Sequence, residues 1–137
     1  MERYEILEHR GDFKIRVFGK DKKELFLNAL LGMNAGFRPE ICSCLLPGSK
    51  HIRKIKSLDL NALLVDFLSE ILYLIQTNKE IYNDVKFIKF IDTELEVELS
   101  GQKVESFGED IKAVTHHGLD ICQNKNKIWE VTIIFDI

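Results

Sequence analysis

Apolar and polar residues alternate with a period of two in the first part of the chain. Residues 13–17 read Phe-Lys-Ile-Arg-Val, and residues 4–6 show the same alternation. This spacing puts the apolar side chains on one face of a strand. The intervening Arg10-Gly11-Asp12 has the composition of a turn. We therefore expect two short strands joined by a turn, with Asp12 at a strand end.

Two later segments have the period of an α-helix. Asp21-Lys-Lys-Glu is a capping pattern, and the apolar residues of 25–36 fall on one helical face. A second helix is predicted to begin at Ser57 or Asp59, because the apolar residues of 60–75 form a wide stripe at helical spacing.

The remaining pattern is rich in strands and turns. We expect an irregular connection over 37–50, a charged edge strand near 52–56, an antiparallel pair over 85–91 and 93–99, a polar connection over 101–110, extended pieces over 111–117 and 119–122, a turn over 124–127 and a last strand over 128–137. This order predicts an α+β fold in two layers, a mainly antiparallel sheet with two amphipathic helices packed on one face. A length of 137 residues fits a single domain spanning 1–137.

Charge and hydropathy narrow the class of partner and the location. The formal net charge is −3, so the chain lacks the basic excess typical of proteins that bind RNA tightly through its phosphates. No secretory signal is predicted at the N-terminus. Asp66 and Glu70 interrupt the most apolar stretch, which argues against a membrane span. We expect a cytoplasmic protein.

Cysteines and the acidic residues of the second helix have unremarkable explanations. The chain has three cysteines, Cys42, Cys44 and Cys122, and this spacing lacks the paired pattern of a structural zinc site. We interpret them as reduced, incidental thiols. Asp66 and Glu70 lie four residues apart on one helical face, which is typical of a solvated surface, with a metal-binding pair as the alternative.

The ends of two predicted strands carry a candidate metal site. Asp12 follows the first turn, and the last strand runs directly into Asp136 and the α-carboxylate of Ile137. If these groups lie together, they repel each other by about 3 kcal/mol per pair at a separation of about 5 Å, and a bound cation removes that repulsion. Hard oxygen ligands favour calcium, magnesium or manganese over zinc or copper. The alternative is that Asp12 is only a turn residue.

Histidines form a second candidate set. His116 and His117 follow a predicted strand, where alternation would place one imidazole on each face of the sheet, and His9 ends the first strand. A histidine in a sheet is more often structural than catalytic. The sequence shows no serine hydrolase arrangement and no glycine-rich phosphate loop. Nothing in it favours an enzyme acting alone.

Four segments together resemble the archease family. The family opens with Glu-His-Thr-Ala-Asp before a short strand, and this chain has Glu8-His9-Arg10-Gly11-Asp12. The family's second helix resembles residues 63–72. The family's late strand reads Lys-Ala-Val-Thr-Tyr-His-Gly, where this chain has residues 112–118. The family's final strand closes on aspartate and an aliphatic residue, as this chain does with Asp136-Ile137. The four motifs span nearly the whole chain in the same order.

The resemblance implies a role in tRNA splicing and RNA repair. Archeases help the ligase that joins 2′,3′-cyclic phosphate or 3′-phosphate ends to a 5′-hydroxyl, by promoting its guanylylation and repeated turnover. The implied metal ligands are Asp12, Asp136 and the terminal carboxylate of Ile137. The implied supporting or partner-facing groups are His9, Lys112 and His117.

Two departures from the family pattern concern this site. Arg10-Gly11 replaces Thr-Ala, which puts a positive charge beside Asp12, and His116 replaces a tyrosine. Two other functions stay open. One is a chaperone-like module of broad specificity that uses strand edges and apolar surface, and the other is a metal-dependent hydrolase that uses Asp12, His117 and Asp136.

Overall fold

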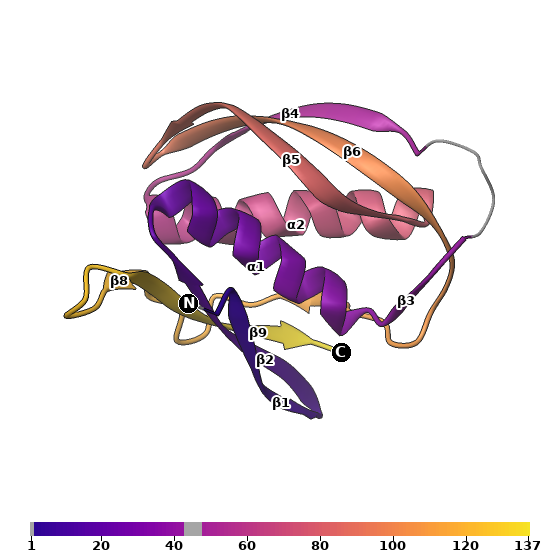
Figure 1. Cartoon of the computed structure of the whole chain (residues 1–137), viewed down its shortest axis with the longest axis horizontal. Helices are drawn as coiled ribbons and strands as arrows, with labels where there is room; N and C mark the ends of the chain where they lie inside the picture. The colour runs from indigo at the N-terminus through magenta and orange to yellow at the C-terminus, as the bar shows by residue number, and fades with distance from the viewer. Residues whose placement is uncertain (1, 43–47) are drawn as a thin grey trace.

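Two helices lie between two antiparallel sheets (Figure 1). The computed structural model describes residues 2–42 and 48–137, and it describes only the backbone of His9. Cys44 lies outside the described residues. The elements are β1 (Tyr4–Arg10), β2 (Asp12–Gly19), α1 (Lys22–Gly36), β3 (Pro39–Ile41), β4 (Lys50–Lys56), α2 (Leu60–Asn78), β5 (Glu80–Ile91), β6 (Glu94–Phe107), β7 (Ala113–Val114), β8 (Cys122–Gln123) and β9 (Trp129–Asp136).

Each sheet is organised around one central strand. In the first sheet the order is β1-β2-β9-β7, and the short β8 also pairs with β9. In the second sheet β6 pairs with β3, β4 and β5. Every pair is antiparallel. The last strand therefore joins the N-terminal hairpin to β7 and β8, and it completes the first sheet.

Side-chain caps set the start of both helices, as the sequence predicts. Asp21 accepts a hydrogen bond from the Glu24 amide at 2.8 Å, and Glu24 accepts one from the Lys20 amide at 3.2 Å. Asp59 accepts from the Ala62 amide at 2.8 Å. These bonds satisfy amides that lack partners within the first turn of a helix.

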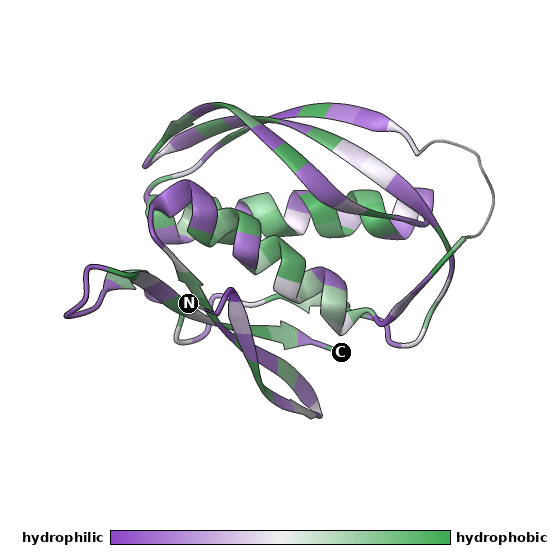
Figure 2. Cartoon of the chain, in the orientation of Figure 1, coloured by the Kyte–Doolittle hydropathy of each residue, from purple (hydrophilic) through white to green (hydrophobic). Residues whose placement is uncertain are grey.

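Helix α2 has a high hydropathy because many of its side chains are buried in the core. By length and composition α2 is apolar enough to span a membrane. Here its apolar side packs into the core, and its polar side is tied to neighbouring residues: Arg53 donates to Glu70 at 3.0 Å, and Ser57 donates to Asp66 at 2.5 Å. Figure 2 shows apolar residues gathered along both helices and alternating with polar residues along the strands. In this fold α2 is a core helix.

The predicted α+β class and the antiparallel pairing are confirmed, but the layering differs from the prediction. The strands form two sheets, one on each side of the helices, instead of a single sheet with both helices on one face. The reason is that both helices bury apolar residues against two sheets: α1 contacts β2 and β5, and α2 contacts β5 and β7. Alternation identifies strands but does not say which sheet each one joins.

Three segments also differ from their predicted form. The expected polar connection over 101–110 is wrong, because β6 continues to Phe107 and buries Val104 while it pairs with β3. The connection over 37–50 contains β3, and the extended pieces over 111–122 shrink to β7 and β8. The strands β3, β7 and β8 are only two or three residues long, and the last part of β6 buries only Val104. In each case the apolar–polar alternation is too brief to recognise.

Candidate functional site

Two carboxylates lie side by side at one edge of the first sheet. Asp12 is the first residue of β2, Asp136 is the last residue of β9, and the two are direct partners in the β2–β9 ladder. Directly opposed residues in an antiparallel pair project from the same face, with Cβ atoms about 4.5–5.5 Å apart. Both side chains are exposed to solvent. The predicted proximity of residue 12 to the end of the final strand is confirmed.

Buried aromatic packing fixes this register. Phe13 and Phe135 are the next partners along the ladder, and both are fully buried with their ring centroids 5.6 Å apart. A slip by one residue would turn every buried side chain of β9 toward solvent. Gly11 has a φ of +72° at the tip of the hairpin, a conformation that residues with a Cβ adopt only with strain. The core on one face therefore aligns the carboxylates on the other.

The C-terminal end of β9 is also held from its second side. The Lys112 amide donates to the Asp136 carbonyl at 2.8 Å, and Ala113 pairs with Asp136. The side chain of Ile137 packs against the core. Lys112, one of the predicted supporting residues, is thus brought beside the acidic pair through its backbone, and its side chain is exposed.

The predicted histidines are placed differently. The strand that precedes them ends at Val114, and His116 and His117 are both exposed, with the Leu119 amide donating to the His116 carbonyl in a turn. The expectation of one imidazole on each sheet face is wrong, because no strand continues there. The ladder between β7 and β9 ends at Val114, so neither histidine is paired with β9. The backbone of His9 pairs with Phe13.

The acidic pair suits a hard divalent cation but supplies few ligands. Carboxylate oxygens are preferred by calcium, magnesium and manganese. Within residues 2–42 and 48–137 the structure contains no cluster of three or more histidine, cysteine, aspartate or glutamate side chains able to hold a metal. Asp12 and Asp136 would supply two donors, and the remaining positions would go to main-chain or terminal oxygens, water or a partner. Arg10 is opposite Asp12 across the hairpin, which adds a positive charge next to the pair.

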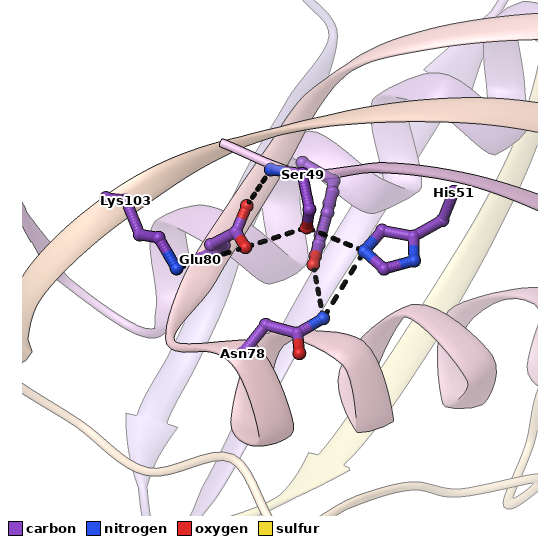
Figure 3. Close-up of polar contacts among 6 residues, drawn as sticks. Ser49, His51, Asn78, Glu80 and Lys103 are labelled. Atoms are coloured by element: carbon purple, nitrogen blue, oxygen red, sulfur yellow. Dashed lines mark hydrogen bonds and ion pairs between the residues drawn. The ribbon is translucent and has the colours of Figure 1, made fainter. Parts of the chain in front are cut away.

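A separate polar cluster lies between the second sheet and the end of α2 (Figure 3). Glu80 is only 1% exposed. Its carboxylate accepts hydrogen bonds from the Ser49 amide and hydroxyl, each at 2.8 Å, and from Lys103 at 3.5 Å. Burial raises the pKa of Glu80, but the Ser49 hydrogen bonds and the Lys103 charge outweigh it, so that the pKa lies below its ordinary value.

The cluster continues through His51 and Asn78. His51 Nε2 lies 2.7 Å from Ser49 Oγ, and Asn78 donates to the Tyr82 hydroxyl at 3.0 Å. Asn78 Nδ2 also lies 3.4 Å from His51 Nε2, so the direction of the His51–Ser49 hydrogen bond depends on the tautomer of the imidazole. The Ser49 hydroxyl has the Glu80 carboxylate as an acceptor, whereas the hydroxyl of an activated serine nucleophile donates to histidine. We interpret the cluster as a structural network that holds the start of β4 against β5 and β6.

Sequence reasoning missed this cluster. Its members come from four elements, β4, α2, β5 and β6, and from the connection before β4, and they form no recognisable spacing along the chain. The only hint was Glu80 directly after the apolar helix, and a single glutamate at a helix end is usually solvated.

Comparisons with known proteins identify the family. A model of the Archease protein family (MTH1598/TM1083) matches residues 4–137. The chain belongs to the archease family. This archease is 32% identical to "Protein archease" of Methanosarcina barkeri, over 99% of this chain and 97% of the relative. It is 28% identical to "Protein archease-like" of Dictyostelium discoideum, over 100% of this chain and 95% of the relative.

Solved structures share its fold. The solution structure of Methanobacterium thermoautotrophicum protein 1598 matches with a TM-score of 0.75 at 24% identity, covering 100% of both chains. The crystal structure of an archease described as a possible chaperone, from Thermotoga maritima, matches with a TM-score of 0.68 at 19% identity, over 97% of this chain and 96% of that chain. At these identities the likeness concerns the fold alone.

Proposed function

We propose that this archease is a protein cofactor of an RNA ligase of the tRNA-splicing type and is not itself an enzyme. It promotes guanylylation and repeated turnover of the ligase in the cytoplasm. The observation that supports this is the in-register opposition of Asp12 and Asp136 in a chain that belongs to the archease family. Two carboxylates at a fixed, solvent-facing strand edge are well placed to enter the cleft of a partner.

The proposed chemistry is metal placement. Transfer of a guanylyl group requires neutralisation of a triphosphate, which a divalent cation supplies. Asp12, Asp136 and the terminal carboxylate of Ile137 would hold calcium, magnesium or manganese at the sheet edge. Lys112, His9 and His117 would contact the ligase around that edge. The net charge of −3 suits a ligase with a basic active site better than direct, tight binding of RNA.

The ligase assay tests the proposal directly. The protein is mixed with ligase, GTP and Mn²⁺, and covalent guanylylation is followed over time. Wild type should stimulate the reaction, and Asp12→Asn and Asp136→Asn should each remove most of the stimulation. Asp84→Asn is the matched control, because Asp84 is an exposed aspartate on β5 of the other sheet. Absence of stimulation by wild type would overturn the activator role, and full activity of both site variants would overturn the site.

The role of Ile137 has its own test. Extra residues appended after Ile137 move the terminal carboxylate away from the acidic pair. Stimulation of the ligase should fall while the thermal midpoint stays within about 2 °C, and the same extension placed before Met1 should leave stimulation intact. Normal stimulation by the C-terminally extended protein would remove the terminal carboxylate from the site.

A chaperone-like activity is the second candidate. It is favoured by Ile52, Ile88 and Ile91, which are 56%, 49% and 48% exposed on β4 and β5 of the second sheet. Exposed aliphatic residues on one sheet can bind unfolded chains. The test is light scattering from an aggregating client protein with wild type and with the triple variant Ile52→Thr, Ile88→Thr and Ile91→Thr. Equal scattering with and without the archease would exclude this activity.

A further inference from the structure

The end of the molecule opposite the acidic pair carries an aromatic hollow. Trp129, Phe90 and the first residues of α1, Asp21, Lys22 and Lys23, line a cavity of about 330 Å³. Trp129 is the first residue of β9 and Asp136 is the last, so the two regions lie roughly 23 Å apart at a rise of about 3.3 Å per residue. The hollow is distinct from the candidate metal site.

The hollow is lined by two aromatic rings, Trp129 and Phe90, and by the ammonium groups of Lys22 and Lys23. Trp129 and Phe90 are half-buried and pack partly against the core. The edge of the Phe90 ring meets Phe26, with centroids 5.0 Å apart, so the Phe90 wall is held from behind. Lys22 Nζ lies 5.1 Å from the centre of the Trp129 ring. A flat aromatic ring system that carries a negative charge matches both kinds of wall.

The lysine over the tryptophan is weakly held. Lys22 also forms an ion pair with Asp92 at 2.7 Å, but the two side chains are 30% and 60% exposed. Exposed ion pairs contribute little, so Lys22 exchanges one anionic partner for another at low cost. Lys23 beside it is exposed. An incoming anion would therefore find two lysines, one of them already aimed at the aromatic face.

Charged residues of both signs surround the hollow. The turn that leads into Trp129 carries Lys125 and Lys127, both exposed, and β8 pairs with the start of β9 through Gln123 and Trp129. Glu24 in the first turn of α1 and Glu130 next to Trp129 add to the negative charge of Asp21 and Asp92. The chain as a whole has a net charge of −3. The basic groups that line the hollow itself are Lys22 and Lys23, so an incoming phosphate would meet these two lysines.

We propose that the Trp129–Phe90 hollow binds a free nucleotide, with the base against Trp129 and the phosphates on Lys22 and Lys23. A volume of about 330 Å³ matches one base with its ribose, and a strand-binding groove would have to be longer. The ligand is therefore a mononucleotide in preference to an RNA strand. This site does not depend on the proposed ligase activation or on the acidic pair.

Trp129 is the single tryptophan of the chain, so its fluorescence reports on this hollow alone. ATP and GTP are titrated separately in the presence of EDTA, with excitation at the red edge of the tryptophan band and free N-acetyltryptophanamide as the correction for absorption. We expect saturable quenching by at least one nucleotide. Inorganic triphosphate, which has no base, should cause none.

Three variants make the result specific. Lys22→Ala combined with Lys23→Ala should weaken binding about tenfold, the equivalent of one charge-assisted hydrogen bond. Lys54→Ala combined with Lys86→Ala removes two exposed lysines on β4 and β5, so this variant is the charge-matched control and should bind as wild type does. Asp12→Asn combined with Asp136→Asn should also leave quenching unchanged, which separates this site from the acidic pair.

Three results would overturn the proposal. One is the absence of saturable quenching by either nucleotide, and another is equal affinity in the double lysine variant. The third is quenching by single-stranded oligonucleotides only, which would indicate an RNA-binding surface instead. Trp129→Phe, which keeps an aromatic ring, checks the fold by circular dichroism, and isothermal titration should show that it retains part of the nucleotide affinity.

Discussion

The rings of Phe13 and Phe135 lie 5.6 Å apart on the buried face of the first sheet, one residue inside the Asp12–Asp136 pair. The apolar contact and the acidic pair are therefore parts of one ladder, and weakening the first should disturb the second.

Phe135→Ala should lower the free energy of unfolding by about 3–5 kcal/mol, because it removes a fully buried ring and leaves a cavity. Chemical denaturation measures the change. Thr132→Ala, on the half-buried outer side of the same strand, should cost less than about 1 kcal/mol. A small loss for the phenylalanine variant would mean that this contact does not anchor β9.

Arg10→Thr should tighten binding of a divalent cation at the acidic pair. Arg10 is opposite Asp12 across the hairpin, and removing its charge eliminates a repulsion of about 1 kcal/mol between Arg10 and the cation. Isothermal titration with Ca²⁺ and Mn²⁺ should show a gain of roughly fivefold. His117→Ala serves as the comparison and should leave the affinity unchanged. Identical affinities for wild type and Arg10→Thr would show that the arginine does not influence the site.

Glu80 should make stability sensitive to acid. Its folded-state pKa lies below the ordinary value of 4.5, so the stabilisation is fully present above about pH 4.5 and disappears as the pH falls through the folded-state pKa. Glu80→Gln keeps the shape but loses the charge, and it should cost about 1–3 kcal/mol at pH 7. The gap between wild type and variant, measured by urea denaturation from pH 7 to pH 3, should narrow as the pH falls. A gap that stays constant would contradict the charge-based explanation.

Gly101→Ala should be strongly destabilising, because a Cβ at this position would lie 2.2 Å from a carboxylate oxygen of Glu80 and 2.8 Å from the ring of Tyr82. We expect a loss of about 2–4 kcal/mol in the free energy of unfolding. Combining Gly101→Ala with Glu80→Ala removes the closest clash, so the double variant should lose less than the sum of the two single losses. Strict additivity would show that the glycine and the glutamate do not interact.

Local patterns predicted most of the elements but not their assembly. Alternation in β2 and β9 and the cap at Asp21 are short-range signals, and each one led to the correct element. The pairing of Asp12 with Asp136 followed from the strand ends and from the resemblance to archeases. The division into two sheets depended on contacts across the helices, which period alone does not encode.

The features that the sequence did not predict are those in which single residues from distant segments come together. The Glu80 cluster gathers isolated polar residues, and the Trp129 hollow joins the start of α1 to the end of β5 and the start of β9. The spacing of these residues along the chain does not predict that they lie close together. The prediction that His116 and His117 lie on opposite faces of the sheet was wrong for a related reason. The segment reads as extended in sequence, but the strand ends before it and a turn follows.

The central position of β9 has a consequence for how the protein is made. Because β9 separates β2 from β7 and β8, a nascent chain that has not yet exposed residues 129–136 cannot close its first sheet. Until then the apolar surface that β9 covers, including the ring of Phe13, remains exposed, and a prematurely terminated product would be a natural target for proteases and a seed for aggregation. The Asp12–Asp136 pair forms only when β9 is in place. The acidic edge would therefore be present only on molecules in which residues 129–136 have been synthesised and have joined the sheet.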